Sequence, residues 1–142
     1  MQNEMMDLMK TFNENSMTTA QRMAELNIKT FEALGAKQSE LFKSCFESAQ
    51  KSAETFANTK DVKELVELQK TTVSECNGKW LSNVREAVET LNGVREEMAG
   101  IYEEARTYAS DSAEKASELS QKAVEENMEK VTELASKATK AA

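Results

Sequence analysis

The sequence contains no histidine and only two cysteines, Cys45 and Cys76. Histidine is the commonest general acid–base group near neutral pH and the commonest metal ligand in proteins. Two cysteines that lie far apart in the chain do not make the closely spaced set of a structural metal site. We therefore expect a protein that is not an enzyme and that uses neither a metal nor a cofactor.

Proline is absent and glycine occurs only four times, so few residues can end or kink a helix. Runs of β-branched residues, which are typical of strands, are also missing. Hydrophobic residues make up 39% of the chain and charged residues 30%. With Ala, Glu, Lys, Leu, Ser and Thr in excess, this composition is typical of long helices and coiled coils, and it predicts an all-α fold.

Long apolar runs are missing too, since none approaches the roughly 20 residues of a membrane-spanning helix. The acidic residues Glu4 and Asp7 stand where a signal peptide would be basic. The net charge of −7 argues against nucleic acid as a partner, because phosphate binding needs a basic surface. We expect no transmembrane segment, no nucleic-acid partner and a cytoplasmic location, where both cysteines stay reduced.

Apolar or small side chains recur every three or four residues over two segments, residues 4–57 and 61–108. This is the period of an amphipathic helix. The first row reads Met5, Leu8, Phe12, Ser16, Ala20, Met23, Asn27, Phe31, Leu34, Gln38, Phe42, Cys45, Ala49, Ala53 and Phe56. Residues 13–19 are poor helix formers, so we expect the first turns to fray, or the helix to begin again near residue 16 or 18.

A turn is predicted between the two segments. Asp61 and Glu64 have the spacing of a capping box, in which Asp61 accepts a hydrogen bond from an early N–H of the next helix and Glu64 reaches back to the Asp61 N–H. Residues 58–60 then form a short connection, and the chain is a long antiparallel helical hairpin. Centring the turn near residue 59 or 60 makes residue i face residue 119−i.

This register places Cys45 level with Cys76, and Phe42 level with Trp80. The cysteines are then either two small buried hydrophobic residues, the interpretation we favour, or a redox bridge. Asn77-Gly78 is a turn signal, but the apolar row resumes in phase at Trp80. We therefore expect a continuous, locally bent second helix.

Residues 109–142 differ in character from the rest of the chain, because alanine replaces most large apolar residues. A row of alanines buries little area and holds a helix only weakly. The register leaves residues beyond about 115 without a partner. We therefore divide the chain into an amphipathic hairpin, residues 1–108 with its turn near 58–61, and a helical assembly segment, residues 109–142.

The apolar rows are wider than one neighbouring helix can cover, so the excess must meet another subunit or an apolar surface. The pattern resembles the phasins, proteins that coat polyhydroxyalkanoate storage granules in bacteria. The resemblance covers residues 20–108. It rests on Asp61 at the turn, on the step Leu65, Leu68, Gln69, and on an upstream Asn with apolar residues at helical spacing, Asn27, Phe31 and Leu34.

The resemblance implies a non-enzymatic granule coat protein that adsorbs to the polyester through amphipathic helices and controls granule size, number and coalescence. It also implies a homo-oligomer, since tetramers occur in the family. The residues expected to bind the granule or another subunit are Phe31, Leu34, Leu41, Phe42, Phe46, Phe56, Leu65, Leu68, Leu81, Val84, Val88 and Leu91.

Two alternatives remain at this point. One is a coiled-coil adaptor or structural protein that binds a specific protein partner. The other is a stress-protective helical protein, which the Ala/Lys/Glu/Ser-rich residues 109–142 suggest. The aromatic-rich segment 31–91 is too hydrophobic for the second class.

Overall fold

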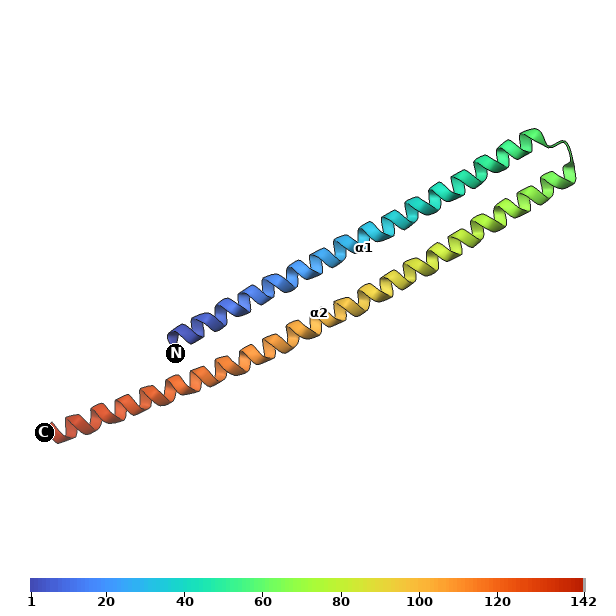
Figure 1. Ribbon diagram of the computed structural model, residues 1–142. Helices are drawn as coiled ribbons and strands as arrows, with labels where there is room; N and C mark the ends of the chain where they lie inside the picture. Colours follow the sequence, from blue (N-terminus) through green and yellow to red (C-terminus); the bar gives the residue numbers. More distant parts are fainter. Residues whose placement is uncertain (142) are drawn as a thin grey trace. The chain divides into compact units, whose positions relative to one another are not determined.

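The computed structural model describes residues 1–141 and consists of two long helices (Figure 1). α1 comprises Gln2–Asn58 and α2 comprises Val62–Ala141, joined by residues 59–61. The described residues 1–141 contain no strand. The prediction of an all-α fold with two helices that pack against each other is therefore confirmed.

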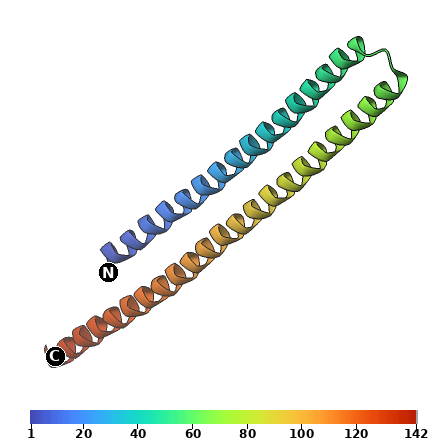
Figure 2. The same cartoon turned by 45° about the vertical axis from the view of Figure 1, so that its right-hand side comes forward.

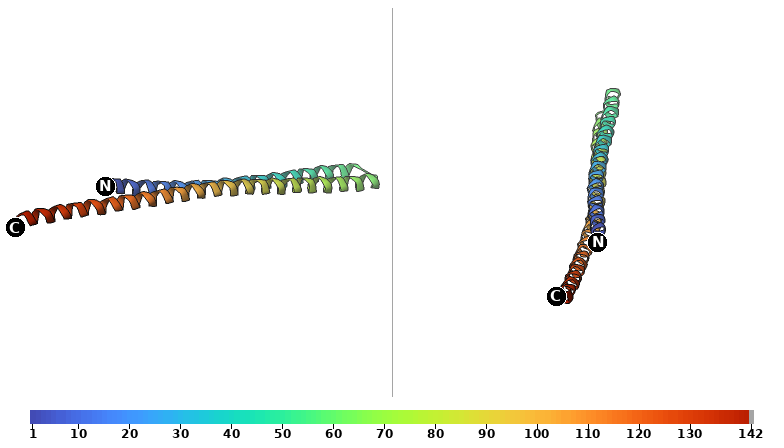
Figure 3. Two further views of the ribbon diagram at one scale, coloured as in Figure 1. Left: turned by 90° about the horizontal axis from the view of Figure 1, so that it is seen from below. Right: turned by 90° about the vertical axis from the view of Figure 1, so that its left-hand side faces the viewer.

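The chain separates into two units, each of which contains parts of both helices. The turn unit comprises residues 24–98 and includes the connection between α1 and α2. The terminal unit comprises residues 1–23 of α1 together with α2 from Ala99 onward. Within each unit the two helical segments lie side by side and run antiparallel (Figures 2 and 3).

The start of α2 confirms the predicted role of Asp61. The backbone N–H of Lys63 donates to Asp61 Oδ1 at 2.9 Å, and the N–H of Leu65 donates to the Asp61 carbonyl at 3.1 Å. Asp61 is therefore the N-cap residue of α2. The second half of the predicted capping box is wrong, because within the described chain no hydrogen bond joins the Asp61 N–H to Glu64. One cap bond already satisfies an early donor, and the exposed Glu64 carboxylate is solvated by water.

The two predicted weak points are both helical. α2 continues through Asn77-Gly78, as expected. α1 also continues through residues 13–19, so the prediction that it frays or restarts there is wrong. The hydroxyls of Ser16 and Thr18 donate to the carbonyls four residues earlier, each at 2.9 Å. These bonds satisfy polar groups that would otherwise compete with the helix.

Very little of the molecule is fully buried. Leu26 in the turn unit and Ile101 and Ser112 in the terminal unit are the buried side chains among the described residues, with Ile101 only 3% exposed. A pair of helices has one line of contact, so most apolar side chains stay partly exposed. We call this line of buried and half-buried residues the seam.

The seam of the turn unit repeats every eleven residues. In α1, Leu26, Lys37 and Ser48 form one series, and Thr30, Leu41 and Ser52 form another. In α2 the series are Leu65, Cys76, Ala87 and Met98; Leu68, Lys79 and Thr90; and Thr72, Asn83 and Val94. Eleven residues over three turns is about 3.67 residues per turn, close to the 3.6 of a straight α-helix. Both helices therefore keep one face on the seam with little distortion.

This observation corrects the predicted row of α1. The seam contains Thr30, Leu41 and Ser52 of α1. Their neighbours Phe31, Phe42 and Ala53 lie outside it. The sequence carries two adjacent rows of uncharged side chains, and periodicity alone does not determine which one faces a partner. Thr30 is accommodated in the seam because its hydroxyl donates to the Leu26 carbonyl at 2.6 Å.

The register differs from the predicted one by about one helical turn. Lys37 bonds to Glu86, and Ser52 bonds to Thr72, so residue i faces about residue 123−i. The connection is centred on residue 60 rather than on 59–60. In addition, helical side chains lean toward the N-terminus of their own helix. Two residues in contact therefore lie about one position further along each helix than two residues whose backbones are at the same height.

Within the terminal unit, the last half-buried residue of α2 is Ala123, and residues 124–140 are exposed. The unpaired part of α2 therefore begins about eight residues later than the predicted 115. The division of the chain at residue 108 stays a prediction, although α2 passes through that point without a break.

Replacement of Ile101 by Ala should lower the free energy of unfolding by about 2–4 kcal/mol, because it leaves a cavity at the most buried position. Tyr102 is 73% exposed, so Tyr102→Ala should change it by no more than about 0.5 kcal/mol. Urea unfolding followed by circular dichroism at one protein concentration measures both. Equal effects of the two substitutions would contradict the assignment of the seam.

Candidate surface-binding site

The turn unit has an exposed apolar face next to its seam. In α1, Phe31 and Phe42 directly follow the seam residues Thr30 and Leu41, and they are 84% and 76% exposed. In α2, Trp80 directly follows Lys79 and is 55% exposed. We call this the apolar face, and its members are Ile28, Phe31, Phe42, Phe46, Phe56, Val62, Val66, Val73, Trp80, Leu81, Val84, Val88 and Leu91, all of them exposed.

The two helices present their parts of the apolar face on the same side of the turn unit. In both, the face lies about 100° beyond the seam in the direction of increasing residue number. Because the helices are antiparallel and face each other, an equal rotation in this sense brings both strips to one side. A groove lined by Ala53 and Phe56 of α1 and by Val62, Val66 and Val73 of α2 confirms that the strips meet.

The α1 part of the face is also free of charge. Between residues 24 and 57, the positions of α1 on this side also include Ala24, Asn27, Gln38, Ser39, Ala49 and Ala53, and none is Asp, Glu, Lys or Arg. The charged residues of α1 lie elsewhere around the helix, as Glu32 and Lys43 illustrate, one position after Phe31 and Phe42. A shift of one residue is therefore enough to pass from the apolar face to a charged one.

The opposite side of the turn unit holds a charged groove, lined by Lys37, Glu40, Lys79 and Glu86 among others. The Lys37 ammonium donates to Glu86 Oε2 at 2.5 Å, and Asn83 Nδ2 donates to the Lys37 carbonyl at 2.9 Å. Hydrogen bonding to Lys37, together with its positive charge, holds the pKa of Glu86 below its usual value. The ion pair between Lys37 and Glu86 and the bond from Asn83 therefore lie on the side away from the apolar face.

The twelve residues predicted to bind a granule or a subunit fall into two groups. Phe31, Phe42, Phe46, Phe56, Leu81, Val84, Val88 and Leu91 are exposed. Leu34, Leu41, Leu65 and Leu68 are half-buried in the seam. The structure thus gathers exposed members on the apolar face and uses the other four to hold α1 against α2.

Five residues of the apolar face were missed in the sequence: Ile28, Val62, Val66, Val73 and Trp80. An eleven-residue spacing could have found several of them. Trp80 precedes Leu91 by eleven residues, and Val73 precedes Val84 by the same interval. The three- and four-residue steps were recognised, but the longer repeat that sorts them into faces was not.

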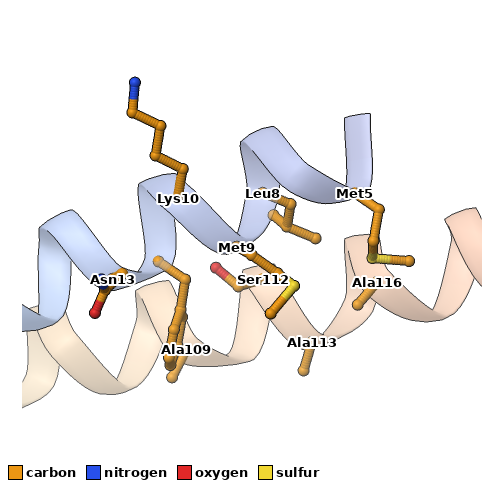
Figure 4. Close-up of a pocket in the computed structure, with 10 residues that line it drawn as sticks. Met5, Leu8, Met9, Lys10, Asn13, Ala109, Ser112, Ala113 and Ala116 are labelled. Carbon is orange, nitrogen blue, oxygen red and sulfur yellow. The ribbon is translucent and has the colours of Figure 1, made fainter. Parts of the chain in front are cut away.

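The terminal unit contains a second apolar groove, drawn in Figure 4. Met5, Leu8 and Met9 of α1 line it opposite Ala109, Ala113 and Ala116 of α2. The methionine side chains point toward α2, whereas Lys10 points away from it (Figure 4). The flexible thioethers of Met5 and Met9 lie beside the small alanines without filling the groove, since Met9 is 68% exposed.

Polar groups of the terminal unit pair across the seam as well. Arg22 Nη1 donates to Glu104 Oε2 at 2.5 Å, and this bond, with the charge of Arg22, lowers the pKa of Glu104. The rings of Phe12 and Tyr108 stack with their centroids 6.4 Å apart. Further along α2, Val124, Met128, Val131 and Leu134 are 58–67% exposed.

Within residues 1–141, no group of three or more Cys, Asp or Glu side chains is placed to hold a metal ion. In the same residues no helix is long and apolar enough to cross a membrane.

An exposed apolar face along two packed helices defines an amphipathic helical protein. A family model described as phasin protein matches residues 4–106. The chain therefore belongs to the phasin family, whose members are non-enzymatic, granule-associated structural proteins. Comparison with curated proteins and with solved structures gives no match.

The ion pairs predict a defined response to acid. Glu86 and Glu104 have folded-state pKa values below the ordinary 4.5. A lowered pKa contributes stability that is present above pH 4.5 and is lost as the pH falls through the folded-state value. Below pH 4.5, the wild-type thermal midpoint should therefore fall more steeply than that of the double variant Glu86→Gln, Glu104→Gln.

The comparison uses thermal unfolding of both proteins between pH 7 and pH 3 at one salt concentration. The double variant retains the remaining carboxylates, so the difference between the two curves isolates the two pairs. Parallel curves across this range would show that Lys37 and Arg22 do not stabilise the ionised carboxylates.

Proposed function

We propose that this protein coats polyhydroxyalkanoate granules by laying the apolar face of its turn unit on the polyester. One observation supports this most strongly. Bulky side chains such as Phe31, Phe42 and Trp80 are exposed on one side, where α1 carries no charge. The ion pair between Lys37 and Glu86 lies on the other side. An aliphatic polyester surface is extended, apolar and uncharged, which matches this face in chemistry.

Adsorption is driven by removal of apolar area from water. A phenylalanine transferred completely contributes roughly 1.5–3 kcal/mol, and one pressed onto a surface contributes a part of that. Eight of the twelve predicted residues are already exposed. The closed helical pair can therefore bind without exchanging Leu34, Leu41, Leu65 and Leu68 between the seam and the polymer.

The charged side of the turn unit remains in water after adsorption. With a net charge of −7, coated granules repel one another at short range. This repulsion limits coalescence and so controls the size and number of granules. The protein acts in the cytoplasm, at the granule surface.

In the absence of polymer, the apolar face needs another partner. We infer that a second copy of the chain covers it, because the exposed apolar area is large for a soluble monomer. In the resulting homo-oligomer the apolar face is covered, and it becomes exposed when the subunits separate at a granule. A specific protein partner is the alternative, and the exposed apolar row from Val124 to Leu134 favours it for that part of α2.

Purified protein should sediment with amorphous polyhydroxybutyrate particles and not with hydrophilic silica. Because the driving force is apolar, binding should persist above about 0.5 M salt, where charge attraction is screened. Co-sedimentation over a salt series measures this. Loss of binding at high salt, or equal binding to silica, would contradict the proposal and leave the protein-binding adaptor as the better hypothesis.

The double variant Phe31→Gln, Phe42→Gln should bind the polyester at least about tenfold more weakly, because two large apolar side chains are lost from the face. Both side chains are exposed, so helicity should not change. The matched control is Glu32→Gln, Lys43→Gln, which alters the adjacent residues and leaves the net charge at −7. We expect wild-type binding from the control, and similar losses in both variants would refute the assignment of the face.

A further inference from the structure

Cys45 of α1 and Cys76 of α2 lie together in the seam of the turn unit. Both are free and half-buried, and Cys76 is the neighbour that most affects the pKa of the Cys45 thiol, which it raises. The predicted register placed them level, and on this point the structure agrees. Neither thiol has a role in the proposed adsorption, since the apolar face consists of other residues.

Hydrogen bonds on both sides hold the two thiols in place. Lys79 Nζ donates to Ser48 Oγ at 3.1 Å, one turn from each cysteine. Closer to the turn, the hydroxyls of Ser52 and Thr72 are hydrogen-bonded. On the other side of the pair, Asn83 binds the carbonyl of Lys37. The helices cannot slide past each other without breaking these bonds, so the sulfur atoms stay neighbours.

We propose that Cys45 and Cys76 form a dithiol–disulfide site that reacts with low-molecular-weight disulfides and locks the turn unit closed. One thiolate attacks the small disulfide, forms a mixed disulfide and releases one small thiol. The other cysteine loses its proton and attacks the protein sulfur, which releases the second small thiol. In total, two protein S–H bonds are replaced by one S–S bond, and the small disulfide is reduced to two thiols.

The Cys45 thiol is protonated rather than ionised at neutral pH. The hydrogen bond with Cys76 is the main cause that raises the pKa of Cys45, and burial adds to it, while the nearby Lys79 ammonium opposes both. Cys45 therefore stays protonated and reacts slowly until an oxidising disulfide accumulates. The site is suited to a change in redox conditions rather than to constant turnover.

The lock leaves the apolar face free. The new bond joins α1 and α2 through their seam, so the helices cannot separate at this level, while Phe42 and Phe46 beside Cys45 remain exposed. On the proposed function, the oxidised protein should still adsorb to polyester as a closed pair. Opening of the seam on the granule, in contrast, would be blocked.

To test this, the full chain is incubated with oxidised glutathione. Intact-mass spectrometry should show loss of two hydrogen atoms without an adduct, and peptide mapping should join Cys45 to Cys76. The thermal midpoint should rise by about 10 °C, because the cross-link restricts the unfolded chain. The single variants Cys45→Ser and Cys76→Ser should give only glutathione adducts or linked dimers, with no such rise.

Adducts or intermolecular dimers alone from the wild-type protein would overturn the proposal, as would a fall in the thermal midpoint on oxidation. The reduced double variant Cys45→Ser, Cys76→Ser checks that the sites tolerate change, and it should unfold close to the reduced wild type.

Polyester co-sedimentation of the oxidised protein tests whether the lock spares the apolar face. Binding equal to that of the reduced protein supports the proposal, and loss on oxidation overturns the closed mode of binding. Failure of the reduced protein to bind would refute the coat function and leave the disulfide site standing.

Discussion

Two helices packed side by side share a single line of contact, and this constraint shapes the whole molecule. Each helix can bury one row of side chains, and every further apolar row stays in water. In the turn unit the buried row includes modest side chains such as Thr30, Ser48 and Ser52, with Leu41 between them. Large side chains such as Phe31 and Phe42 lie outside it. A chain built this way carries a large apolar area that its own fold does not cover.

The polar interactions of the turn unit are subject to the same constraint of a single line of contact. Lys37 donates to Glu86 and accepts at its carbonyl from Asn83 on one side of the seam, where charged residues of both helices also lie. The other side holds uncharged residues of α1 and the apolar strip of α2. An amphipathic helix of ordinary type has one apolar stripe, but here each helix has a seam stripe and an outer stripe. This division lets a helical pair stay closed and still present an exposed apolar surface.

Much of the fold could be read from the residues. Asp61 marked the start of α2, and the absence of proline together with the helical period predicted two long helices. The continuity of α2 through Asn77-Gly78 followed from the phase of the apolar row. The predictions of a frayed start of α1 and of a return bond from Glu64 to the Asp61 N–H were wrong. Hydroxyl-to-carbonyl bonds and water satisfied the groups that the local sequence left open. The register was displaced because side chains lean toward the N-terminus of their helix.

The amino-acid sequence by itself determined the helical class, the place of the turn and the presence of more apolar surface than one hairpin can bury. These features follow from local preferences and from composition, which need no partner to act. Only the tertiary structure decided which row becomes the seam, which side is charged and which residues remain exposed. Neighbouring rows on a helix differ by one residue in the chain, and only the position of the second helix distinguishes Leu41 in the contact from Phe42 beside it.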